Sequence, residues 1–163
     1  MSTNNQQQHS PLSKTSLIGG IIILLSILGY YGNKAVQSYL GQQAIEQTGL
    51  EVLSLEQALK VAKNSNKLVL ADFSAIWCPS CRKLDKQVFS DERVKNQFNQ
   101  NFVYARIEFD SQAGKSFMKN YQVMGFPTLL VVNAKGEKLV QLPVSYEPSP
   151  FLRSLEKVIK ARP

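Results

Sequence analysis

The chain has 163 residues, of which 44% are hydrophobic and 19% charged, as in ordinary globular proteins and unlike disordered ones. Its net charge is +7, but the basic residues are scattered among acidic ones without an aromatic stacking pattern. This distribution predicts a solvated surface, on which Arg106 is one of the basic residues, and it excludes a nucleic-acid-binding face.

A polar tail and an apolar segment begin the chain. Residues 1–16 are rich in Gln, Asn and Ser, so they cannot form a packed core. Residues 15–33 carry no charge, and as a helix they span about 28 Å, close to the hydrocarbon thickness of a bilayer. Tyr30 and Tyr31 stand near its end, where aromatic rings favour the headgroup region. We therefore predict one N-terminal transmembrane helix, an anchor over residues 17–32.

A cleaved signal peptide is the main alternative, because its apolar core needs only about 7–15 residues. The sequence after the segment offers no small-x-small cleavage site, which favours an uncleaved anchor. A buried soluble helix is disfavoured because no polar face interrupts the run. Lys14 precedes the segment and Lys34 follows it, so with the amino terminus the charges favour a cytoplasmic N-terminus only slightly.

Beyond the anchor, residues 33–50 are expected to be a stalk or linker, and residues 51–163 a folded domain. Val36, Tyr39 and Leu40 recur at helical spacing before Gly41 and Gly49, which predicts a helical extension that fades into a linker. A capping box at residues 54–57 opens the first helix of this domain. Strands are predicted at residues 68–73, 102–109, 128–132 and 138–142. Further helices are predicted after Cys78, after Ser90, after Ser111 and after Ser149, where Pro150 takes the first helical position. This order predicts an α/β three-layer sandwich, a mixed central sheet flanked by helices.

The two cysteines of the chain, Cys78 and Cys81, follow Trp77 and enclose Pro79 and Ser80. At the start of a helix, this spacing puts both sulfurs on one face. The free N–H groups and the dipole of the helix then stabilise a thiolate at the first cysteine. The pattern predicts a redox-active dithiol for thiol–disulfide exchange, with no cofactor besides the cysteine pair.

Three other uses of the cysteines are disfavoured. A structural zinc site needs four ligands, and the chain adds only His9, which lies in the polar tail. Haem attachment needs His after the second cysteine, where Arg82 stands. A purely structural disulfide across so short a loop would stabilise the fold little.

Three motifs stand out in the domain: ADFSAIWCPSCRK at residues 71–83, VFSDERV at residues 88–94 and VMGFPT at residues 123–128. By these motifs, residues 52–162 resemble the thioredoxin fold. Within it they are similar to the C-terminal periplasmic domain of the thiol:disulfide interchange protein DsbD and its single-domain relatives. The resemblance implies a protein-disulfide reductase or exchange enzyme that acts on disulfides of exported proteins. Another membrane or periplasmic thiol protein is expected to supply its electrons.

The resemblance also implies roles for individual residues. Cys78 corresponds to the exposed attacking nucleophile and Cys81 to the buried resolving thiol. Pro127 corresponds to a proline that follows a cis peptide bond and faces the dithiol, so that Phe126 pairs with an extended substrate segment.

Asp72 corresponds to a buried carboxylate beneath the site, and a raised pKa would let it exchange a proton with Cys81. Its apolar neighbours favour burial over a surface position. Trp77 is expected to shield the dithiol. Ser80 departs from the usual Gly-Pro pair, and a hydrogen bond from it to the Cys78 thiolate would favour the reduced form.

Several functions stay open at this stage. The same dithiol would serve a reductase, an oxidase or an isomerase, and an anchored binding module could use residues 126–127 without turnover. Because disulfides belong to oxidising compartments, the prediction is a single-pass protein of the bacterial inner membrane with its catalytic domain facing the periplasm.

Overall fold

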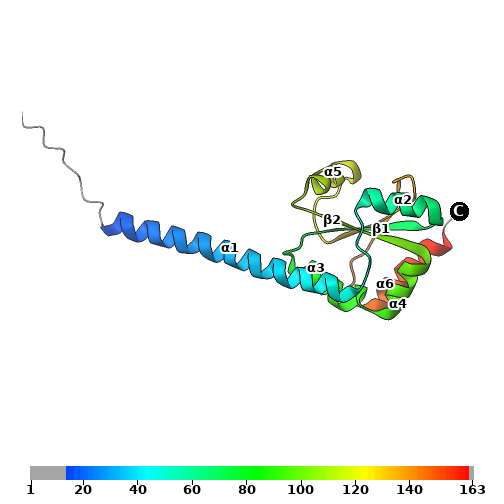
Figure 1. Cartoon of the computed structure of the whole chain (residues 1–163), viewed down its shortest axis with the longest axis horizontal. Helices are drawn as coiled ribbons and strands as arrows, with labels where there is room; N and C mark the ends of the chain where they lie inside the picture. Colours follow the sequence, from blue (N-terminus) through cyan, green and yellow to red (C-terminus); the bar gives the residue numbers. More distant parts are fainter. Residues whose placement is uncertain (1–13, 162–163) are drawn as a thin grey trace, which may run out of the picture. The chain divides into compact units, whose positions relative to one another are not determined.

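The structure is a computed structural model that describes residues 14–161 (Figure 1). His9 and most of the predicted polar tail at residues 1–16 lie outside the described residues. The chain divides into two compact units at residues 35 and 36, and each unit is described by itself.

The first unit contains the N-terminal part of helix α1 (Lys14–Thr48). Its apolar side chains are exposed, from Leu17 at 61% to Tyr31 at 65%. Among the described residues, this is the one helix long and apolar enough to cross a bilayer. A helix of this kind near the N-terminus fits both a membrane anchor and a signal sequence, so the anchor over residues 17–32 stays a prediction.

The second unit is built on a mixed four-stranded sheet, as the sequence predicts. Its strands are β1 (Leu68–Ser74), β2 (Phe102–Glu108), β3 (Thr128–Val132) and β4 (Lys138–Leu142). They lie in the order β2-β1-β3-β4, with β1 parallel to β2 and antiparallel to β3. Every residue of β1 is buried, because it lies between two strands and under helices on both faces.

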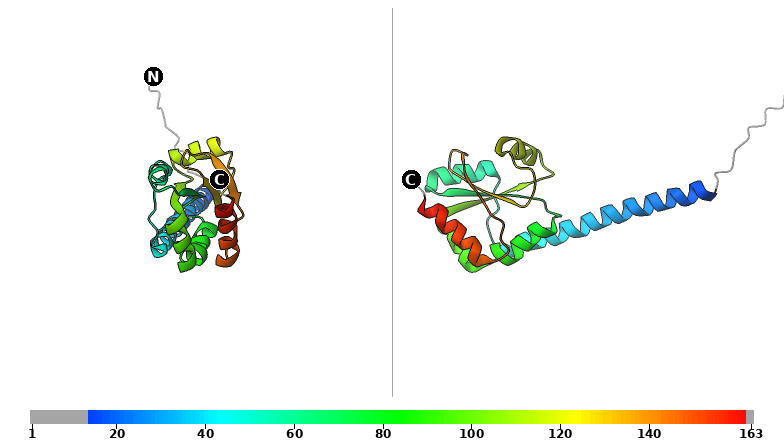
Figure 2. Two further views of the ribbon diagram at one scale, coloured as in Figure 1. Left: turned by 90° about the vertical axis from the view of Figure 1, so that its right-hand side faces the viewer. Right: turned by 180° about the vertical axis from the view of Figure 1, so that it is seen from behind.

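Helices cover both faces of the sheet and complete the predicted three-layer sandwich (Figure 2). One face carries α2 (Leu55–Ser65) and α5 (Gln112–Tyr121). The other carries α3 (Pro79–Leu84), the π-helix η1 (Asp85–Phe89), α4 (Glu92–Asn101) and α6 (Pro148–Lys160). The capping box of Ser54 and the N-cap of Ser111 are confirmed by their side-chain bonds to Gln57 and Gly114.

Alternation along β1 decides which side chains meet which helices. Leu68 and Leu70 join the core beneath α3, α4 and α6, whereas Val69 and Phe73 join the core beneath α2 and α5. Asp72 shares the face of Leu70, so its carboxylate points into the layer that begins with α3.

Three local expectations are corrected. The predicted helical extension at residues 33–50 does not end near Gly41 but continues as α1 to Thr48, and its part from residue 36 belongs to the domain's compact unit. Asp91, not Ser90, caps α4, because its carboxylate accepts the N–H of Arg93. Helix α6 begins at Pro148 rather than after Ser149, since either proline tolerates the first helical turn.

Candidate active site

Cys78 and Cys81 are joined as a disulfide at the N-terminus of α3, with their Cα atoms 5.3 Å apart. Cys78 is the N-cap residue, and its Sγ accepts the backbone N–H of Cys81 at 3.1 Å. Pro79 takes the first helical position, where a missing N–H costs nothing. The predicted proximity of the two sulfurs is thus confirmed, and the first sulfur lies at a helix end that favours negative charge.

Both cysteines are less accessible than the resemblance implies. Cys78 is 5% exposed and Cys81 1%, so the expected exposed nucleophile is buried in this disulfide form. The reason is a set of aromatic side chains packed against the pair, from Trp77, Phe109 and Phe126. Cys78 is still the more accessible of the two residues.

Trp77 lies beside the dithiol, as predicted, and a hydrogen bond fixes its ring. Its Nε1 donates to Oδ2 of Asp110 at 2.8 Å. The indole meets the Phe126 ring edge to face, with centroids 5.4 Å apart. Asp110, in the turn after β2, and Phe126, in the loop before β3, therefore orient the residue that directly precedes Cys78.

The segment that contains Phe126 and Pro127 reaches the same cluster, and the peptide bond between these residues is cis. Phe126 packs against Phe109 with ring centroids 4.9 Å apart. The hydroxyl of Thr128 donates to the Gly125 carbonyl at 2.7 Å and closes the turn. The fold thus brings a segment about 45 residues later in the sequence to the dithiol, where the resemblance places it.

Ser80 lies on the exposed side of α3, between the two cysteines. In this disulfide form Cys78 Sγ accepts its hydrogen bond from the Cys81 backbone. A bond from Ser80 to a Cys78 thiolate concerns the reduced protein and stays a prediction.

Asp72 is fully buried, as predicted, and three side chains donate to it. Its Oδ1 accepts the hydroxyl of Ser74 at 2.5 Å. Its Oδ2 accepts the hydroxyl of Tyr104 at 2.7 Å and Nη1 of Arg106 at 3.0 Å. The carboxylate therefore belongs to a polar network inside the core rather than to an apolar cavity.

Arg106 is the centre of that network, which corrects its assignment to the surface. Its side chain is only 4% exposed, and it contacts three carboxylates. Nη1 donates to Asp72 and, at 3.1 Å, to Asp85, while Nε donates to Glu108 at 2.9 Å. On β2, Arg106 shares its face with buried Tyr104, and this alternation was the one signal in the sequence that could have indicated its burial.

Burial and the neighbouring charges shift the pKa values of three side chains in this network. Burial raises the pKa of Asp85 to about 7, against the opposing effect of the Arg106 charge. Burial also raises the pKa of Tyr104, and the Asp72 charge adds to this. Burial alone would lower the pKa of Arg106, but the charges around it, with Asp72 first, raise it above its ordinary value.

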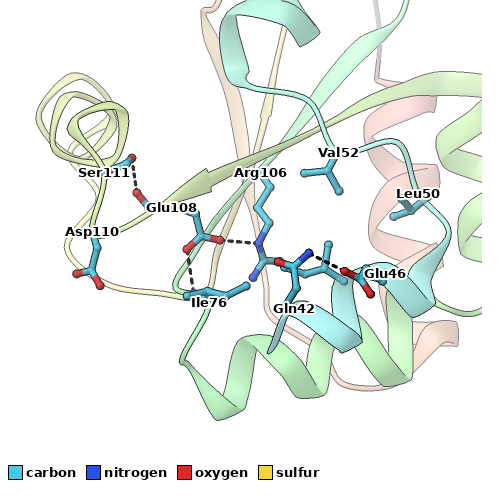
Figure 3. A pocket seen from close by; sticks show the side chains of 10 residues that line it. Gln42, Glu46, Leu50, Val52, Ile76, Arg106, Glu108, Asp110 and Ser111 are labelled. Atoms are coloured by element: carbon cyan, nitrogen blue, oxygen red, sulfur yellow. Dashed lines mark hydrogen bonds and ion pairs between the residues drawn. The ribbon is translucent and has the colours of Figure 1, made fainter. Parts of the chain in front are cut away.

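Glu108 links the network to the loop that leads into the dithiol. While Oε1 accepts from Arg106, Oε2 accepts the backbone N–H of Ile76 at 2.8 Å (Figure 3). Arg106, Glu108 and Ile76 line a pocket of about 720 Å³, together with Gln42 and Glu46 of α1. The described residues include no group of three or more His, Cys, Asp or Glu side chains that could hold a metal ion.

The family model described as a thioredoxin-like domain matches residues 55–159. The chain belongs to the thioredoxin-like domain family. This confirms the fold class and the resemblance expected from the sequence.

The sequence of this thioredoxin-like domain is similar to that of interchange proteins. The thiol:disulfide interchange protein DsbD of Photorhabdus laumondii is 25% identical over 135 residues, which cover 78% of this chain and 24% of that protein. The chain therefore spans about a quarter of the length of this relative.

Solved structures share the fold. A thioredoxin from Thermus thermophilus matches with 28% identity and a TM-score of 0.60, over 68% of this chain and 87% of that one. A putative disulphide-isomerase from Bacteroides thetaiotaomicron matches with 33% identity and a TM-score of 0.56, over 70% and 94%. The oxidised C-terminal domain of DsbD from Neisseria meningitidis matches in fold, with 22% identity and a TM-score of 0.51, over 69% and 100%.

Proposed function

We propose that this thioredoxin-like protein is a membrane-anchored thiol–disulfide oxidoreductase that reduces or exchanges disulfides in exported proteins. The observation that carries the proposal is the Cys78–Cys81 disulfide, with Cys78 as the N-cap of α3. A sulfur at this position is stabilised as a thiolate after reduction, which makes it the attacking group. The similarity to DsbD supports the same chemistry.

The proposed reaction passes two electrons from the protein to its substrate. The Cys78 thiolate attacks one sulfur of a substrate disulfide, whose S–S bond breaks and releases one substrate thiolate. Cys81, after losing its proton, attacks Sγ of Cys78 in the mixed disulfide and releases the second substrate thiolate. The Cys78–Cys81 bond forms, and a dithiol protein must reduce it before the next cycle.

Other residues of the cluster support these steps in the proposal. Trp77 and Phe126 exclude water from one side of the dithiol, since both pack against it. The backbone around Phe126 and Pro127 would pair with an extended substrate segment. Asp72 would exchange a proton with Cys81, within a network that also includes Arg106.

The proposed arrangement has an anchor at residues 17–32, with the tail at residues 1–16 in the cytoplasm and the domain in the periplasm of a bacterium. The apolar helix supports an anchor by its length and composition. Electrons would come from another membrane or periplasmic thiol protein. The match to a putative disulphide-isomerase makes isomerisation by the same dithiol the second candidate.

A trapping experiment tests the proposal. Replacing Cys81 with Ala leaves Cys78 without its resolving partner, so mixed disulfides with substrates should accumulate and appear on non-reducing gels. The wild type should also catalyse the reduction of insulin by dithiothreitol. Cys78→Ser should abolish both the trapped adducts and the insulin reduction. Wild-type protein that is reducible but inactive, without Cys78-dependent adducts, would instead indicate a binding module.

A further inference from the structure

The C-terminal part of α1 packs against the domain through one face. Gly41, Ala44 and Thr48 are buried, whereas Gln42 and Glu46 between them are exposed. Buried positions three and four residues apart lie on one side of a helix. The segment predicted as a stalk or linker is thus packed on the folded domain, on the side where residues 76–82 lie.

Gly41 contacts the loop that leads into the dithiol. A Cβ atom at this position would collide with the carbonyl oxygen of Ile76, two residues before Cys78. Only a hydrogen atom fits between Cα of Gly41 and this oxygen. No other residue type allows the helix to approach the loop so closely.

Strand β2 also holds this residue of the loop. The N–H of Ile76 donates to Glu108 at 2.8 Å, and Glu108 is in turn bound by Arg106 (Figure 3). The N–H of Cys78 donates to the Ala75 carbonyl at 2.9 Å and closes the turn. The loop is therefore held both by these hydrogen bonds and by its contact with α1.

Helix α1 also contacts the chain just after the dithiol. Gln37 lies one helical turn before Gly41 on the same face, and its Oε1 accepts Nη1 of Arg82 at 2.6 Å. Arg82 directly follows Cys81. One helix face thus contacts the chain on both sides of the two cysteines.

We infer that Gly41 and Gln37 are positioning residues of the active site, which fix the loop before Cys78 and the helix turn after Cys81. This inference rests on the proposed redox function of the dithiol. The stability of a Cys78 thiolate depends on its contact with the N–H of Cys81, and a shift of the loop changes that contact. The reactivity of the dithiol is then set in part by a segment that directly continues the apolar helix.

The test compares two identical substitutions in one helix, in the full chain in detergent. Gly32→Ala is the matched control, since a Cβ there meets nothing within 4 Å, whereas Gly41→Ala forces the loop to move. We expect Gly41→Ala to change the equilibrium constant of the Cys78–Cys81 pair with glutathione by about tenfold, or ~30 mV. The alkylation rate of reduced Cys78 should change as well. Gly32→Ala should change neither.

A second pair of variants serves if Gly41→Ala does not fold. Gln37→Ala removes the bond to Arg82 without adding an atom, and Gln47→Ala replaces an exposed glutamine of the same helix. Gln37→Ala should change the equilibrium constant with glutathione and the alkylation rate of Cys78 by a smaller factor. Gln47→Ala should leave both at the wild-type values. A folded Gly41→Ala protein with the wild-type equilibrium constant and alkylation rate would overturn the inference. If Gly41→Ala does not fold, the same result for Gln37→Ala would overturn it.

These readouts separate the inference from the proposed function. Equilibration with glutathione and alkylation by iodoacetamide need no protein substrate. A wild type that fails to reduce insulin, but whose equilibrium constant shifts in Gly41→Ala, would refute the function and retain the positioning role. A wild type that reduces insulin, with variants whose equilibrium constants equal the wild-type value, would support the function and refute the positioning role.

Discussion

Nη1 of Arg106 lies 3.0 Å from Oδ2 of Asp72, and both side chains are buried although they are 34 positions apart in the chain. Strand pairing places them directly opposite each other on β2 and β1. The same guanidinium contacts Asp85, so one cation pairs with two buried carboxyl groups. Its removal leaves charge in the core without a partner.

Arg106→Met should therefore lower the free energy of unfolding by about 3–5 kcal/mol, the usual effect of breaking a buried ion pair from one side. Guanidinium denaturation of the full chain in detergent would measure it. Arg93→Met is the control, because Arg93 pairs with Asp91 at the surface with 61% of its side chain exposed, and it should cause little change. Equal effects of the two substitutions would contradict the central role of Arg106.

The pH dependence of stability should report on Asp85. Its pKa rises from 3.8 to about 7 on folding because of burial, so the folded protein retains a proton that the unfolded chain has released. The free energy of unfolding therefore loses a contribution from this group as the pH rises from about 4 to about 7. This loss should be absent in Asp85→Asn.

Denaturation of the two proteins at a series of pH values would measure this contribution. The free energy of unfolding of the wild type minus that of Asp85→Asn should decrease as the pH rises towards 7 and stay constant above it. Parallel curves across this range would show that Asp85 ionises in the folded protein as it does in the unfolded chain.

Ser80→Ala should make the dithiol more reducing. If the Ser80 hydroxyl donates to the Cys78 thiolate, its loss destabilises the reduced form, and the equilibrium constant with glutathione shifts towards the disulfide by up to about tenfold. Ser65→Ala is a suitable control, because Ser65 is an exposed helical serine on α2 whose hydroxyl donates to the carbonyl of Val61 in its own helix. An unchanged constant in Ser80→Ala would exclude this hydrogen bond.

The predicted topology has its own test. A reporter that is active only in the periplasm, fused after Pro163, should be active and should sediment with the membranes. An inactive reporter would place the domain in the cytoplasm. An active but soluble product, shorter by about thirty residues, would identify the apolar segment as a cleaved signal.

Local sequence was sufficient to predict most of the fold and the centre of the candidate site. Capping side chains act on N–H groups two or three residues away, which is why the starts of α2 and α5 were predictable from Ser54 and Ser111. The spacing of Cys78 and Cys81 at a helix start likewise determines their proximity by itself. Burial of Asp72 followed from the apolar run around it.

Contacts across the sheet could not be predicted in the same way. Arg106 looks like any surface cation until the register of β1 against β2 places it opposite Asp72. The glycine at position 41 looks like a helix terminator, yet it lies inside α1. Glycine fits this position because Ile76, 35 residues later, leaves no room for a side chain.

The sequence by itself therefore determined the dithiol, the apolar segment and the order of strands and helices, since each depends on neighbours within a few residues. The tertiary structure alone decided what holds the loop before the dithiol: the Arg106 network through Glu108, and the face of α1 through Gly41. Both depend on distances between segments far apart in the chain, which are fixed only when the sheet and its helices pack together.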